Sequence, residues 1–117
     1  MKSAVLVDDE IDLVESIQEV LETEDIKIVA TGNNGQEAVE LCIKHLPDFL
    51  ILDLGMPKFD GIHALEKLSE KNSSIKVIIM TGLLDEEHKA NLKRFKIDAS
   101  FIKPTSPIAI ADFIKNN

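Results

Sequence analysis

The sequence predicts an α/β domain in which five parallel strands form one sheet with helices on both faces. Short apolar, mostly β-branched runs alternate with longer segments whose apolar residues recur at helical spacing. The apolar runs are nearly continuous, as expected of parallel strands that are buried on both faces. A strand–helix repeat of this kind forms one sheet with right-handed crossovers. A single domain over residues 1–117 is therefore expected.

Five segments are predicted to be strands. Each is a short apolar run that is bounded by polar or turn-forming residues. Their expected ranges are residues 4–7, 26–30, 49–52, 76–80 and 100–102.

Five helices are predicted between and after these strands. The first is expected over residues 11–24, with Val14, Ile17 and Leu21 on its buried face. The second begins at Asn34, where Glu37 completes a capping box.

The remaining three helices are also located by the residues at which they begin. The third is expected to begin at Asp60 and Gly61, and the fourth near Asp85. The last begins with Ser106, a capping residue, followed by Pro107 at the first helical position.

Composition narrows the range of functions. The chain has 117 residues, 44% of them hydrophobic, and a formal net charge of −8. This charge argues against binding to nucleic acid or to an anionic membrane, because both need a basic surface. The single cysteine, Cys42, excludes an internal disulfide and is expected to be a small buried hydrophobe. No apolar run approaches the roughly 20 residues of a membrane span, and a cytoplasmic location is expected.

Polar residues follow each predicted strand. In an open parallel sheet, ligands bind outside the carboxyl ends of the strands, so these residues are expected to share one edge. They are Asp8, Asp9 and Glu10, then Thr31 and Gly32, Asp53, Thr81 and Gly82, and finally Lys103 and Pro104.

This set of residues suits phosphoryl transfer. Neighbouring carboxylates repel one another unless a cation joins them, and oxygen ligands suit Mg²⁺. Asp53 can act as a nucleophile, Lys103 can neutralise phosphoryl oxygens, and Thr81 can donate a hydrogen bond. Taken singly, Asp8 could cap a helix, and Thr81 and Lys103 could be ordinary turn and surface residues. Taken together they have no structural use, because the arrangement costs repulsion.

The sequence resembles a response regulator receiver domain of two-component signal transduction, of the stand-alone, chemotaxis-receiver-like type. The resemblance covers essentially the whole chain and rests on the order and spacing of short motifs. These are Val7-Asp8-Asp9-Glu10, Leu52-Asp53-Leu54-Gly55-Met56-Pro57 with Asp60-Gly61, Met80-Thr81-Gly82 and Lys103-Pro104.

The resemblance implies a flavodoxin-like fold with strand order 2-1-3-4-5 and a phosphorylatable switch. Asp53 would accept a phosphoryl group from the phosphohistidine of a histidine kinase or phosphotransfer protein. Mg²⁺ would be held by Asp9, Asp53 and the Gly55 carbonyl, with Asp8 reaching it through water. Lys103 would contact the phosphoryl group, Thr81 would signal its presence, and Pro104 would follow a cis peptide bond.

Further expectations concern activity and partners. The domain would catalyse its own phosphorylation and dephosphorylation, with no separate substrate. The kinase would meet the first helix and the loop at Thr105 and Ser106, an unidentified effector protein would read the switch, and the domain would be a monomer or weak homodimer. One alternative is a receiver-like interaction module that is never phosphorylated. Another is an aspartyl-phosphate phosphatase, which Gly55 disfavours because such enzymes place a second aspartate there.

One position departs from the family pattern. Receivers usually carry an aromatic switch residue three positions before the lysine, where this chain has Ser100. Phe101 is one step later, and strand parity sends it to the opposite face of the sheet. We therefore expect Phe101 to be a core residue. Either Ser100 replaces the aromatic switch with a smaller hydrogen-bonding movement, or signalling runs through Thr81 and the loop that follows it.

Overall fold

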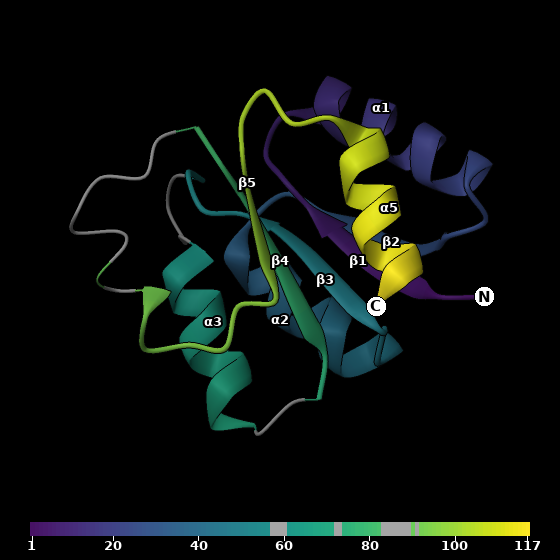
Figure 1. Cartoon of the computed structure of the whole chain (residues 1–117). Coiled ribbons are helices and arrows are strands. Elements are labelled where there is room, and N and C mark those ends of the chain that lie inside the picture. Colours follow the sequence, from purple (N-terminus) through teal and green to yellow (C-terminus); the bar gives the residue numbers. More distant parts are fainter. Residues whose placement is uncertain (57–60, 72–73, 83–89, 91) are drawn as a thin grey trace.

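The computed structural model describes residues 1–56, 61–71, 74–82, 90 and 92–117. Within them, five parallel strands form one sheet in the order β2-β1-β3-β4-β5 (Figure 1). The predicted fold class and strand order are thereby confirmed. The strands are β1 (Ser3–Val7), β2 (Lys27–Gly32), β3 (Phe49–Asp53), β4 (Lys76–Thr81) and β5 (Ala99–Ile102).

Helices cover both faces of this sheet. In the order of the chain they are α1 (Ile11–Thr23), α2 (Gly35–His45), α3 (Gly61–Glu70) and α5 (Pro107–Asn116). Helices α1 and α5 pack on one face, and α2 and α3 pack on the other (Figure 1). The start predicted for a fourth helix, near Asp85, lies outside the described residues.

The three central strands divide their side chains between two cores. In β1, Ala4 and Leu6 join the core beneath α1 and α5, whereas Val5 and Val7 join the core beneath α2 and α3. Strands β3 and β4 alternate in the same way, because successive side chains point to opposite faces. The continuous apolar runs of these strands are explained by burial on both sides.

The two outer strands correct the expectation that every strand is buried on both faces. Residues in β2 and β5 are only half-buried or exposed. Each of these strands has a neighbour on one side only, so less of its surface is covered.

The predicted capping residues begin α2 and α5, but one hydrogen bond of the predicted capping box differs. The Asn34 side chain accepts a hydrogen bond from the Glu37 amide at 2.8 Å, as a capping residue should. The Glu37 carboxylate, however, accepts from the amide of Asn33 at 2.8 Å, one residue before the cap. At α5, the Ser106 hydroxyl accepts from the Ala109 amide at 3.3 Å, and Pro107 is the first helical residue.

Two further sequence predictions concern buried residues. The buried face of α1 consists of Val14, Ile17 and Leu21, as predicted. Cys42 is fully buried, and burial raises the pKa of its thiol to about 12. Among the described residues, no helix has the length and apolar character needed to cross a membrane.

Candidate functional site

The carboxyl ends of the central strands bring the predicted site residues to one edge of the sheet. Asp8 follows β1, Asp53 ends β3 and Thr81 ends β4. Lys103 follows β5, and its backbone N–H donates to the Thr81 carbonyl oxygen at 2.7 Å. Backbone pairing between neighbouring strands therefore sets the relative positions of these residues.

Lys103 lies among three carboxylates. Its Nζ atom is 2.7 Å from Asp8 Oδ2, 3.3 Å from Asp53 Oδ2 and 3.8 Å from Glu10 Oε1. Asp8 and Asp53 are buried, and the Lys103 side chain is only 16% exposed. One ammonium group thus bridges the ends of β1 and β3 in a setting from which water is largely excluded.

Backbone amides orient the other carboxylate oxygens. The Gly55 N–H donates to Asp53 Oδ1 at 3.0 Å, and the Glu10 N–H donates to Asp8 Oδ1 at 2.9 Å. Asp8 Oδ2 is buried and makes no aligned hydrogen bond, although the Lys103 ammonium lies at ion-pair distance. Both aspartates therefore point one oxygen at the backbone and the other toward the charged cluster.

Burial and neighbouring charges shift the pKa values of Asp53 and Lys103. Burial raises the pKa of Asp53 above its ordinary value, and the charge of Asp8 adds to this effect, while the Gly55 N–H and Lys103 oppose it. Burial alone would lower the pKa of Lys103, but its contacts with Asp8 and Asp53 outweigh burial and raise it. The lysine therefore stays protonated at neutral pH.

The same edge has the composition of a divalent-cation site. Asp8, Asp9 and Glu10 each offer a carboxylate oxygen, and the three oxygens lie within 4.8 Å of one another. The donors are all hard oxygen atoms, which suits Mg²⁺ or Ca²⁺. The Asp8 Oδ2 atom already has a cationic partner, the Lys103 ammonium at 2.7 Å. Glu10 was not among the predicted metal ligands, although three consecutive acids were visible in the sequence.

The remaining predicted residues lie around this cluster. Thr81 is buried at the end of β4, Gly55 is exposed beside Asp53, and the Lys103–Pro104 peptide bond is cis. Ser100 is exposed in β5 and pairs with Ile79, two residues before Thr81.

Phe101, next to Ser100, is half-buried and packs against the core beneath α1 and α5. Neighbouring β5 residues therefore point to opposite faces, as strand parity requires.

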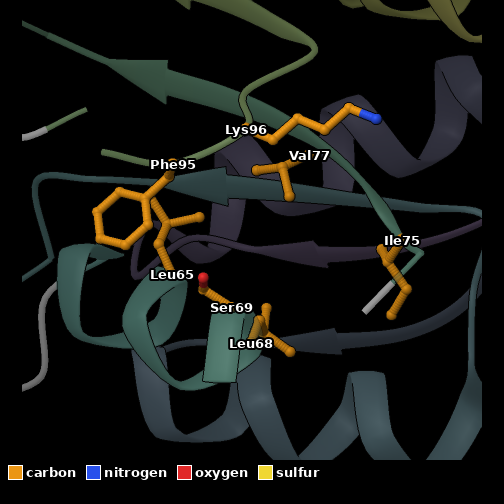
Figure 2. A pocket seen from close by; sticks show the side chains of 7 residues that line it. All are labelled: Leu65, Leu68, Ser69, Ile75, Val77, Phe95 and Lys96. Atoms are coloured by element: carbon orange, nitrogen blue, oxygen red, sulfur yellow. The ribbon is translucent and has the colours of Figure 1, made fainter. Parts of the chain in front are cut away.

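A hollow elsewhere in the molecule is separate from this cluster. It has a volume of about 220 Å³ and lies between α3 and the first residues of β4, at the opposite end of that strand from Thr81. Figure 2 shows the α3 side chains Leu68 and Ser69 on one side of the space and Val77 and Lys96 on the other, with Leu65 beside the Phe95 ring at one end. None of the described residues that line it is acidic.

Comparison with known proteins identifies receiver domains and response regulators as relatives of this chain. The family model for the response regulator receiver domain matches residues 4–115. The chemotaxis protein CheY of Halobacterium salinarum is 30% identical over 115 residues, which span 98% of this chain and 95% of that protein. The transcriptional regulatory protein DegU of Brevibacillus brevis is 28% identical over 95% of this chain. The chain spans only 48% of the length of DegU.

Solved structures are similar over nearly the whole chain. A DNA-binding response regulator of the LuxR family from Staphylococcus aureus has a TM-score of 0.91 at 26% identity, covering 99% of this chain and 98% of that one. A chain of the CheX-CheY-BeF3-Mg+2 complex from Borrelia burgdorferi has a TM-score of 0.88 at 25% identity, covering 98% and 87%.

Proposed function

The chain belongs to the response regulator receiver family, and on this basis we propose that residues 1–117 form one phosphorylatable switch with Asp53 as the acceptor. The observation that supports this most directly is the Lys103 ammonium, which lies 2.7 Å from Asp8 and 3.3 Å from Asp53. A buried carboxylate beside a fixed cation is suited to become an acyl phosphate, because the cation offsets the added negative charge.

The proposed step transfers a phosphoryl group from a phosphohistidine to Asp53. A carboxylate oxygen of Asp53 forms a bond to phosphorus, and the phosphorus–nitrogen bond breaks with its electron pair remaining on the imidazole. The Gly55 N–H fixes the acceptor through Oδ1, which reduces the freedom that the carboxylate must lose. Lys103 neutralises charge on the phosphoryl oxygens.

A divalent cation would act beside these residues. Asp9, Asp53 and the Gly55 carbonyl would hold Mg²⁺, with Asp8 reaching it through water. When bound, the ion would neutralise negative charge on the phosphoryl group. The related Borrelia burgdorferi chain was solved as a CheX-CheY-BeF3-Mg+2 complex, which supports Mg²⁺ and a protein partner here as well.

Partner binding is proposed at the rim of the site. Ile11, at the start of α1, is 67% exposed, and Ile108, in the first turn of α5, is 48% exposed. Helices α1 and α5 are in contact, so both apolar side chains can meet one partner. A histidine kinase or phosphotransfer protein in the cytoplasm would bind there, and an effector would read Thr81 and Ser100.

Acetyl phosphate with Mg²⁺, followed by intact-mass measurement, tests the proposal. The wild type should gain one phosphoryl adduct, and Asp53→Asn should gain none. Asp12→Asn is the matched control, because Asp12 is an exposed acid on α1 outside the cluster, and it should keep the adduct. No adduct on the wild type would support a phosphorylation-independent interaction module. Rapid release of phosphate from phosphate esters would support a phosphatase.

A further inference from the structure

Two adjoining hollows lie at the end of the sheet away from the acidic cluster. The first is the hollow of about 220 Å³ between α3 and the start of β4 (Figure 2). The second, of about 440 Å³, lies against the end of α2 and is lined in part by Ile43, Leu46 and Pro47. Leu68 and Ile75 line both hollows, so together these form one groove, here called the α2–α3 groove.

Leu46 is a strained and exposed apolar residue at the rim of this groove. Its φ of 47° lies in the left-handed region, where a leucine side chain is unfavourable. Among the described residues, Asp25 is the one other non-glycine residue with a positive φ, and aspartate tolerates that region. The Leu46 side chain is 76% exposed, so packing within the domain does not offset the strain. Backbone strain of this kind occurs preferentially at functional positions.

A second exposed apolar side chain lies next to Leu46. Ile43, in the last turn of α2, is 49% exposed and lines the same hollow. The exposed pair Ile11 and Ile108, at the starts of α1 and α5, lies at the opposite end of the sheet. Ile43 and Leu46 therefore belong to a separate apolar surface, and apolar side chains exposed together are typical of binding surfaces.

The charged side chains of the groove are basic, in contrast to the chain as a whole. Lys71 and Lys96 line it, and none of the described lining residues is acidic. Both lysines are exposed, and among the described residues neither has an ion-pair partner. The net charge of the chain is −8. An apolar surface flanked by two such lysines is complementary to a segment that carries carboxylates beside its apolar side chains.

The position of the groove limits the kind of segment that fits it. A strand can be added only at the sheet edges, β2 and β5, whereas the groove lies mainly against α2, α3 and the start of β4. A second copy of this chain that docked through the same surface would bring its lysines near those of the first, which costs repulsion. A helix that places an apolar face in the groove avoids both difficulties.

We propose that the α2–α3 groove binds an acidic amphipathic helix of a partner protein. Ile43 and Leu46 contact the apolar face of this helix, and Lys71 and Lys96 pair with carboxylates beside that face. The groove lies at the opposite end of β3 from Asp53, so this site is separate from the proposed phosphorylation site. The strain at Leu46 is then retained for binding, at the expense of stability in the unbound domain.

A displayed library of helical peptides about four turns long tests the proposal. Every peptide carries the same apolar face, and the positions beside that face vary among acidic, basic and neutral residues. Selection on the wild type should enrich peptides with aspartate or glutamate beside the apolar face. Fluorescence anisotropy of the enriched peptides then gives their dissociation constants for the wild type and its variants.

The apolar contact is tested with Leu46→Asn, which should weaken binding of the enriched peptides on the order of tenfold. Urea unfolding should show this variant to be at least as stable as the wild type, because asparagine tolerates the left-handed region better. Ile102→Asn is the matched control, since Ile102 is an exposed apolar residue of β5 outside the groove. It should change binding by less than about twofold.

The charge contact is tested with Lys96→Glu, which should also weaken binding on the order of tenfold. Lys27→Glu makes the same change in net charge at an exposed position of β2 outside the groove. It should change binding by less than about twofold, because distant exposed charges are screened.

Enrichment of basic peptides, or of none, would overturn the inference. Equal affinity of the enriched peptides for the wild type and Leu46→Asn would do the same, as would equal losses in Lys96→Glu and Lys27→Glu. A dimer in sedimentation that Leu46→Asn dissociates would assign the groove to a second copy instead. Leu46→Asn should still gain the phosphoryl adduct from acetyl phosphate, so these outcomes are independent of whether Asp53 is the acceptor.

Discussion

At the scale of single residues, the site depends on two carboxylates, Asp8 and Asp53, that the fold buries close together although their burial and mutual repulsion are unfavourable. Asp8 and Asp53 are both buried, and each has one oxygen fixed by a backbone N–H. Lys103 offsets part of the cost of placing them together. Such a cluster is expected to reduce stability in return for reactivity.

Replacing Asp53 with asparagine should stabilise the fold at neutral pH. The pKa of Asp53 is raised in the folded protein, so its ionised form opposes folding at pH 7. This penalty fades as the pH falls through the raised pKa toward the ordinary value. Urea unfolding should therefore show Asp53→Asn more stable than the wild type by about 1 kcal/mol at pH 7. The advantage should shrink in acid.

The control for this prediction is Asp12→Asn. Its carboxylate is exposed, and its stability should stay within about 0.5 kcal/mol of the wild type across the same pH range. A less stable Asp53→Asn at pH 7, or a difference that does not depend on pH, would show that the ion pair with Lys103 outweighs burial.

At the scale of elements, the end of β3 and the start of α3 approach each other closely. A Cβ atom added at Gly61 would lie 2.6 Å from Leu54 Cδ2 and 3.1 Å from the Asp53 carbonyl oxygen. The absence of a side chain at Gly61 is therefore what allows α3 to begin directly beside the acceptor strand.

Gly61→Ala should destabilise the protein by about 1–3 kcal/mol, because the end of β3 or the start of α3 must shift. It should also slow phosphorylation of Asp53 by acetyl phosphate. Gly82→Ala is the matched control for stability, since an added Cβ there meets no described atom within 4 Å. Equal unfolding free energies for the two variants, measured in urea, would contradict the close approach.

Leu46 ends α2 in an unfavourable backbone conformation. Its φ is 47° and its ψ is 58°, and its side chain is 76% exposed. Leucine pays a steric penalty in this left-handed region, which asparagine tolerates better. Leu46→Asn should therefore stabilise the protein by about 0.5–1 kcal/mol in thermal or urea unfolding.

Ile43→Asn provides the comparison for Leu46→Asn. Ile43 is also an exposed apolar residue, but it lies within α2, where asparagine is a poorer helix former than most residues. This variant should be neutral or slightly less stable than the wild type. A Leu46→Asn variant that is no more stable than Ile43→Asn would show that the strain at the end of α2 is negligible.

At the scale of the whole molecule, two hydrophobic cores stabilise the sheet, and the charged side chains lie at the carboxyl ends of its strands. The core beneath α1 and α5 and the core beneath α2 and α3 fix the strands from both sides. The carboxylates at the edge can therefore repel one another without separating the strands. A cation that binds only the folded arrangement should stabilise the entire domain.

Mg²⁺ should accordingly raise the midpoint of thermal unfolding, and chelation should reverse the effect. At a free concentration about one hundred times the dissociation constant, the gain is about 2.7 kcal/mol. Asp9→Asn should reduce the gain, because the proposed site loses a carboxylate. An equal gain in Asp9→Asn, measured by calorimetry in the same buffer, would place the ion elsewhere.

The sequence predicted the strands of the sheet and most of the residues that meet at its carboxyl edge, but not Glu10. Apolar runs located the five strands within one or two residues of their ends. The signal is strongest for β1, β3 and β4, because these strands are buried on both faces. Polar residues after the strands identified Asp8, Asp53, Thr81 and Lys103, because parallel strands place their carboxyl ends at one edge. The resemblance supplied the strand order.

Only the tertiary structure decided how these residues divide their contacts. That Lys103 is nearer to Asp8 than to Asp53, and that Glu10 joins the cluster, depends on distances between loops that are far apart in sequence. The partial exposure of β2 and β5 depends on their places at the edges of the sheet. Local sequence encodes which faces of a strand are apolar, whereas long-range packing sets which charged groups meet and how much water reaches them.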